Sequence, residues 1–278
     1  MPTPSLHPLM RAEFSAAKLW LRVAGAVQWL AVGVALVPLV YATRTTQFIA
    51  AAAAFAVPIV LFFLRQQAAP HQVRGERLRR FHLLLDGTGR PPPKDELADL
   101  VAGRTSLRSF DPTLDGDYFS SKLPPGQPRL VDNLMESAFY TKETSSTAAR
   151  LYGGLALTGI LVTGGLVFYW LNTYSGTLDK GSTDYAQIVA ALVVFFGVGH
   201  LADCAFAFRE LNQESDAVYR ETVRLRHAAT SELDADELHS LLARYDCAVL
   251  RAPPVPGQIY KVRRRRLDEA WRMVFGSA

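Results

Sequence analysis

The stretch VAGAVQWLAVGVALVPLVY, residues 23–41, decides the fold class because it runs for a membrane-spanning length without a charge. After the polar ATRTTQ, the stretch FIAAAAAFAVPIVLFFL, residues 48–64, is uncharged as well. Two later blocks, residues 151–171 and 185–208, are almost as apolar. As helices these blocks would be about 26 to 36 Å long, which matches a hydrocarbon core of roughly 30 Å. The pattern predicts four transmembrane helices.

The alternative class is a soluble helical bundle with very apolar core helices. Such helices normally carry a polar face, and these four blocks carry almost none. Pro38 and Pro58 fit membrane helices, where neighbours satisfy the freed carbonyl groups. The averages of the 278-residue chain, 49% hydrophobic residues and a net charge of +4, hide this segregation. We therefore favour the membrane class.

The lysines and arginines predict the orientation. The short connections 42–47 and 172–184 hold Arg44 and Lys180, whereas nearly all other basic residues lie outside the hairpins. By the positive-inside rule, both termini and the long middle segment are cytoplasmic. The chain is thus predicted to be an all-α membrane protein with four transmembrane helices in two hairpins and a helical cytoplasmic module. Its parts are a cytoplasmic N-terminal arm (1–22), hairpin 1 (23–64), a cytoplasmic helical and loop segment (65–150), hairpin 2 (151–208) and a cytoplasmic helical tail (209–278).

The cytoplasmic parts show helix signals separated by turn signals. We expect the second span to continue as a helix that ends near Gly87–Gly89, followed by a proline-led loop, a short helix and a loop at 104–128. Apolar residues at Leu130, Leu134 and Ala138 predict a helix that leads into the third span. The fourth helix should extend past Phe208. A new helix with Ser231 or Asp234 as N-cap, a break at APPVPG and a basic last helix should complete the tail.

Small residues in the third span suggest how helices meet. Gly154 and Thr158, and likewise Gly159 and Thr163, stand four residues apart. Small residues at this spacing allow helix backbones to approach closely in lipid. The spacing fits either packing within one chain or an assembly face between copies.

The fourth block contains two ionisable residues near its cytoplasmic end. His200, Asp203 and Cys204 share one face of a helix. A buried aspartate at the centre of a membrane helix costs about 2.5–3.5 kcal/mol, so such residues usually have partners or line water. The favoured interpretation is an interfacial clasp to Lys18 or Arg22 on the first helix. A gating role at a pore mouth and metal ligation by His200, Asp203 and Cys204 are the alternatives.

Two arginine clusters are candidate ligand sites, because the guanidinium group suits phosphate. The first lies after the second span and the second opens the last helix. The alternatives are topology-setting charges for the first cluster and a solvated or headgroup-facing surface for the second. The candidates are Arg77, Arg79 and Arg80, and then Arg263, Arg264, Arg265 and Arg266.

Enzyme chemistry has little support in the sequence. There is no phosphate-binding glycine loop, no HExxH motif and no Cys/His set with zinc spacing, and the two cysteines do not suggest a disulfide framework. We therefore predict no catalytic residues, no cofactor, no bound metal and no DNA or RNA partner.

Three stretches resemble a known family. LMRAEFSAAKLW (9–20), RLRRFHLLLDG (77–87) and LLARYDCAVLRAPPVPGQIYKVRRRR (241–266) are similar, in order and position, to segments of the SMODS-associated four-transmembrane effector family. The likeness covers most of the chain as topology and loose motifs, and it assigns no residue of this sequence a role.

The resemblance implies a function. It suggests an oligomeric effector that forms pores in the bacterial inner membrane. Such an effector would act in abortive infection, in which damage to the host membrane stops phage replication. The trigger would be a cyclic nucleotide or cyclic oligonucleotide. The alternative is a membrane-anchored scaffold or sensor whose output is its cytoplasmic module, without ion conduction. A small transporter is less favoured, because no span has the paired Gly/Pro interruption around a polar site at mid-membrane.

Overall fold

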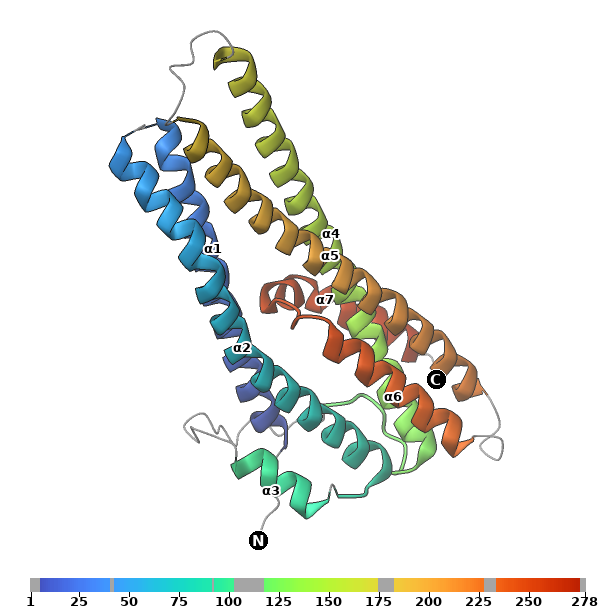
Figure 1. Cartoon of the computed structure of the whole chain (residues 1–278). Helices are drawn as coiled ribbons and strands as arrows, with labels where there is room; N and C mark the ends of the chain where they lie inside the picture. Colours follow the sequence, from blue (N-terminus) through green and yellow to red (C-terminus); the bar gives the residue numbers. More distant parts are fainter. Residues whose placement is uncertain are drawn as a thin grey trace. The chain divides into compact units, whose positions relative to one another are not determined.

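The computed structural model describes residues 6–40, 43–91, 93–102, 118–174, 183–227 and 234–275, and within these ranges every regular element is an α-helix. The prediction of an all-α chain is confirmed there. Lys180, Ser231 and most of the loop expected at 104–128 lie outside the described residues. Figure 1 shows the helices coloured in chain order. They are α1 (Leu6–Val40), α2 (Arg44–Thr88), α3 (Lys94–Ala102), α4 (Gln127–Tyr174), α5 (Thr183–His227), α6 (Ala235–Arg251) and α7 (Gly257–Phe275).

The chain divides into two compact units. The first, called the core unit below, consists of the described parts of Met1–Ala17, Pro70–Ala148 and Ala207–Ala278. The second, called the apolar unit, consists of the described parts of Lys18–Ala69 and Ala149–Phe206. All four points at which the chain passes from one unit to the other fall inside α1, α2, α4 or α5.

The core unit is organised around the first half of α4. Leu130, Leu134 and Ala138 are at most 3% exposed, which confirms the apolar spacing predicted for this helix. They belong to a cluster that joins α4 to the end of α2, the second half of α5 and α6. Its other large members include Leu83, Val218, Leu225, Leu238, Leu242 and Tyr245.

Two smaller clusters attach the remaining helices to the core unit. Leu6, Leu9 and Met10 at the start of α1 contact Leu78 and Phe81 of α2 together with Leu100 of α3. Met135 and Phe139 of α4 contact Leu267 and Trp271 of α7. Every described helix therefore places apolar residues in the core unit.

Two glycines end α2 and set its distance from α4. Gly89 has a φ of 71°, and its N–H donates to the carbonyl oxygen of Leu85 at 2.8 Å, as at many helix C-termini. A Cβ on Gly87 would lie 2.9 Å from the Cα of Leu130, so the two helices approach closely at this point. The predicted helix end near Gly87–Gly89 is confirmed.

The tail forms the two helices expected from its sequence. Asp234 is the N-cap of α6, and its Oδ1 accepts a hydrogen bond from the Asp236 N–H at 2.9 Å. The helix ends at Arg251, before the proline pair at 253–254. The predicted break at APPVPG and the basic last helix, α7, are therefore confirmed.

The apolar unit exposes its large side chains. Trp29 is 62% exposed on α1, Phe55 is 76% exposed on α2, and Phe168 is 74% exposed on α4. Among the described residues, one helical stretch, Phe48–Thr88 of α2, is long and apolar enough to cross a membrane. Only 11% of its most apolar 18-residue window is buried, unlike the core helix of a soluble bundle. The other three spans remain predictions.

Candidate functional site

Arg79 on α2 forms an ion-paired centre inside the core unit. Its Nε donates to Glu76 Oε2 at 2.6 Å, and its Nη2 donates to Asp246 Oδ1 of α6 at 3.1 Å. Its guanidinium carbon lies 4.8 Å from the centre of the Tyr245 ring. Burial opposes the charge, but the carboxylates of Glu76 and Asp246 raise the pKa of Arg79 above its ordinary value. Arg79 is therefore a fixed internal cation.

Tyr245 and Asp246 extend this centre to α4 and to a second arginine. The Tyr245 hydroxyl lies 2.6 Å from Thr141 Oγ1 and donates to the Ser137 carbonyl oxygen at 3.0 Å. Arg80 Nε lies 3.4 Å from Asp246 Oδ2. Burial raises the pKa of Asp246, while the charges of Arg79 and Arg80 oppose that shift. The centre thus connects α2, α4 and α6.

The structure separates the arginines of the first predicted cluster. Arg79 points into the core unit, the Arg80 side chain is about half exposed, and Arg77 is exposed. Since successive helix residues are about 100° apart, residues 77, 79 and 80 cannot all present one face. Arg77 and Arg80 are the members that a soluble ligand can reach.

The arginines of the second cluster are also divided among different surroundings. Arg263 Nη1 donates to Thr147 Oγ1 of α4 at 2.5 Å. Arg264 Nε lies 3.6 Å from Asp268, and Arg265 Nε lies 3.0 Å from Glu269, both within α7. Arg266 is exposed.

A buried glutamate joins three elements of the core unit, and the sequence analysis missed it. Glu136 Oε2 on α4 accepts hydrogen bonds from the Ser120 N–H and Oγ–H, both at 2.8 Å. Trp271 Nε1 of α7 donates to the same Ser120 Oγ at 2.7 Å. Burial raises the pKa of Glu136, and the Ser120 hydrogen bonds oppose that rise. The sequence did contain one signal for this site, because Glu136 stands among the apolar, core-facing positions of an amphipathic helix.

The candidate residues of the fourth apolar block experience a charge that the sequence did not suggest. His200 Nε2 lies 3.6 Å from Cys204 Sγ, as expected for residues four apart on one face. The charge of Arg65 on α2 acts on both residues. Asp203 is exposed, and so is Arg22, one of the two expected partners. In the described part of the chain, no three His, Cys, Asp or Glu side chains are placed to hold a metal ion, so the metal alternative has no support.

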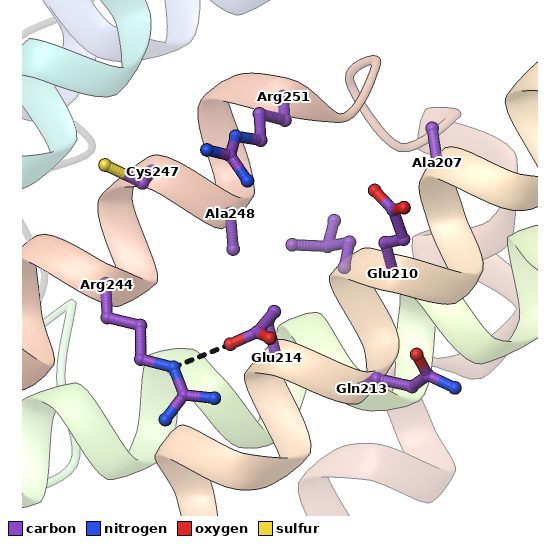
Figure 2. A pocket seen from close by; sticks show the side chains of 9 residues that line it. Ala207, Glu210, Gln213, Glu214, Arg244, Cys247, Ala248 and Arg251 are labelled. Carbon is purple, nitrogen blue, oxygen red and sulfur yellow. Dashed lines mark hydrogen bonds and ion pairs between the residues drawn. The ribbon is translucent and has the colours of Figure 1, made fainter.

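A groove between α5 and α6 is the second site that sequence reasoning missed. Its volume is about 520 Å³. Figure 2 shows Glu210 of α5 and Arg251 of α6 on facing sides of the groove. Arg244 Nε donates to Glu214 Oε2 at 2.7 Å at one end. The groove therefore offers both an acidic and a basic side chain to one small molecule. Its lining residues are Ala207, Glu210, Leu211, Gln213, Glu214, Arg244, Cys247, Ala248 and Arg251.

Comparisons of this chain with known protein families, with curated proteins and with solved structures find no match. Its function has to be inferred from its own residues and their geometry.

Proposed function

We propose that this chain is a multi-pass protein of the bacterial inner membrane, with four spans in two hairpins and both termini in the cytoplasm. The observation that carries the proposal is the contrast between the two units. The core unit buries most of its large apolar side chains, whereas Phe48, Phe55 and Phe168 of the apolar unit are 74–76% exposed. In water each such side chain would forgo about 1.5–3 kcal/mol of burial, and a patch this extensive marks a lipid or protein contact.

The proposed activity is pore formation by several copies of the chain. The interior of one four-helix protomer is packed, so a conduit needs further copies or a large rearrangement. Among the described residues outside its own turn of helix, none comes within 4 Å of a Cβ added at Gly154, Gly164 or Gly165. Thr158 is exposed as well. These four small residues of α4 are thus open to another chain, which favours the assembly face over packing within one chain at these positions.

The proposed trigger is a nucleotide second messenger, either a cyclic nucleotide or a cyclic oligonucleotide. The α5–α6 groove has suitable chemistry, because Arg251 can bind a phosphate and Glu210 can accept hydrogen bonds from a base amino group. Arg77 and Arg80 remain candidates on α2. To open the pore, the ligand must bind the open arrangement more tightly than the closed one.

A gating role for His200 and Asp203 belongs to the same proposal. In the apolar unit, the charge of Arg65 on α2 also acts on His200 and Cys204 of α5. A change in the pairing of these groups would accompany movement of α5 against α2. Conductance of Asp203→Asn should then differ from that of the unaltered chain at equal membrane insertion.

The deciding experiment measures the membrane potential of bacterial cells that express the chain. A pore should depolarise the membrane, and the purified chain in vesicles should release a trapped dye when a cyclic dinucleotide or cyclic trinucleotide is added. The scaffold or sensor alternative predicts an intact potential and no dye release although the chain is inserted. Arg251→Ala should abolish the ligand response, whereas Arg220→Ala, a loss of charge outside the groove, should preserve it.

A further inference from the structure

The start of α7 lies beside the part of α4 that leads into its apolar segment. Arg263 Nη1 donates to Thr147 Oγ1 at 2.5 Å. Thr147 is four residues, or about 6 Å along the helix, before Leu151, where the uncharged stretch begins. Gln72, which follows the apolar stretch of α2, donates a hydrogen bond from its Nε2 to the carbonyl oxygen of Ala252 at 2.6 Å. Ala252 is the residue directly after α6. If α2 and α4 enter a bilayer, α7 begins close to the headgroups.

The outward surface of α7 combines cations with two unusually exposed apolar side chains. Val262 is 82% exposed and Met273 is 72% exposed. Among the described residues of the core unit, the other exposed large apolar side chains are 39–43% exposed. Arg265 is 91% exposed at its side chain. The surface, called the outer face of α7 below, consists of Lys261, Val262, Arg265, Arg266, Glu269, Arg272 and Met273.

The opposite side of α7 fixes this helix to the core unit. Ile259, Leu267 and Trp271 are 3–7% exposed. Trp271 Nε1 also donates to Ser120 Oγ at 2.7 Å. Ile259 and Trp271 are therefore unavailable to lipid. Among the described side chains of α7, Val262 and Met273 are the most exposed apolar ones.

The ion pairs within α7 leave its outer face attractive to phosphate. Arg265 lies 3.0 Å from Glu269, one turn further along the helix. Exposed pairs of this kind contribute little, so a phosphate can replace the carboxylate at small cost. Cations beside exposed apolar side chains are typical of helices that lie in a membrane interface.

We infer that the outer face of α7 rests on the anionic headgroups of the cytoplasmic leaflet, with Val262 and Met273 in contact with the lipid and the cations on phosphates. This inference rests on the proposed membrane insertion. Each cation close to an anionic surface strengthens such a contact by about fivefold. The outer face would thus hold the core unit against the bilayer.

The test uses the full chain with a fluorescent label at a single introduced cysteine. Cys247→Ser removes the exposed thiol, while Cys204 is buried. The label stands at Val262→Cys in one protein, at Ser240→Cys on the exposed part of α6 in a second, and at Phe55→Cys in a third. Vesicles of phosphatidylcholine alone, or mixed with phosphatidylglycerol, carry a nitroxide quencher on the headgroup or in the acyl chain.

We expect headgroup quenching at Val262→Cys in the mixed vesicles, with at least a fivefold weaker effect in neutral vesicles or at high salt. Ser240→Cys should show little quenching in either. The triple change Arg265→Gln, Arg266→Gln and Arg272→Gln should abolish the lipid dependence. The matched triple change Arg77→Gln, Arg90→Gln and Arg220→Gln removes three exposed cations elsewhere in the core unit and should preserve it.

Three outcomes would overturn the inference. The first is equal quenching at Val262→Cys in neutral and anionic vesicles. The second is an equal effect of the two triple changes. The third is protection of the label by a second copy or an acidic protein instead of by lipid. Acyl-chain quenching at Phe55→Cys separates the two proposals. If that label is quenched and Val262→Cys is not, the role of α7 is wrong and membrane insertion stands. If the Phe55→Cys label escapes quenching, both fail.

Discussion

Arg79 of α2 and Asp246 of α6 form an ion pair inside the core unit, with Nη2 and Oδ1 3.1 Å apart. The two residues are 167 positions apart in the chain. Their side chains are 11% and 12% exposed, so water replaces neither partner readily. Removing one member of such a pair leaves an uncompensated charge, whereas removing both can cost little.

Asp246→Ala should therefore destabilise the core unit by about 3 kcal/mol, because among the described residues Arg79 then keeps Glu76 as its one paired carboxylate. The measurement is the denaturant midpoint of the detergent-solubilised chain, followed by its intrinsic tryptophan fluorescence. Adding Arg79→Met together with Glu76→Gln should recover much of the loss, because no unpaired charge is then left in this centre. Additive effects of Asp246→Ala and this second pair of changes would show that the charges are not coupled.

Gly87→Ala should destabilise the contact between α2 and α4. The new Cβ would lie 2.8 Å from Leu130 Cδ1 and 2.9 Å from Leu130 Cα, so the backbone of α2 or α4 would have to shift. Such overpacking costs about 1–3 kcal/mol. Thermal unfolding measures the effect. Gly126→Ala is the matched control, since its nearest new contact is an ordinary 3.7 Å, and similar losses from the two changes would contradict the close approach.

The pKa of Glu136 predicts a pH dependence of stability. Burial raises this pKa above the ordinary value of 4.5, with smaller contributions from Asp132 and Asp86. The folded chain then binds more protons than the unfolded chain above pH 4.5. The contribution of Glu136 to the free energy of unfolding is thus greatest below pH 4.5 and falls as the pH rises through the folded pKa.

Glu136→Gln should remove this part of the pH dependence, because the amide oxygen still accepts the Ser120 hydrogen bonds and carries no charge. Unfolding midpoints from pH 4.5 to neutral pH test the expectation. Glu210→Gln, on the exposed side of α5, serves as the control for a general loss of negative charge. Parallel pH profiles for Glu136→Gln and the unaltered chain would rule out the assignment.

Phe55→Lys should impair membrane insertion of the second apolar block. A lysine at the centre of a span costs about 3 kcal/mol relative to phenylalanine. The fraction of chain that stays in the membrane after an alkaline wash reports the effect. Leu123→Lys, at a 43% exposed position of the core unit, should have no effect on that fraction. An unchanged fraction for Phe55→Lys would argue against lipid contact at α2.

Gly154→Leu should weaken assembly without unfolding the protomer, since no described residue outside its own turn of helix lies within 4 Å of the new Cβ. Cross-linking in vesicles compares the proportion of oligomers. Gly153→Leu is the informative neighbour, because a Cβ there would lie 3.9 Å from Ala205 Cβ and touches α5 of the same chain. Normal oligomers from Gly154→Leu would remove this surface from the assembly face.

The helices could be predicted from signals within a few residues, whereas the sites depend on contacts between residues that are far apart in the chain. The apolar spacing of Leu130 and Leu134, the cap at Asp234 and the glycine at 89 each act within a few residues, so the sequence alone identified these elements. The partner of Arg79 could not be read in the same way. Asp246 meets it because α6 packs against α2, and that register depends on the whole core.

The second basic cluster shows the same limit. A run of four arginines indicates a basic helix, but it does not indicate which side of that helix the core takes. Leu267 and Trp271 decide this by joining Met135 and Phe139, which turns Arg265 outward and Arg263 toward Thr147. The α5–α6 groove depends in turn on how these two helices lie relative to each other. A pattern of neighbouring residues in the sequence does not predict that placement.

The discontinuity of the core unit has a consequence for biosynthesis. Its three stretches are separated in the chain by the two hairpin regions, and α7 supplies Trp271 after both have been made. If the hairpins insert as proposed, the ribosome delivers each of them to the insertion machinery while the core unit is still incomplete. The order of translation would then keep the core unit incomplete until the apolar helices are already in the membrane.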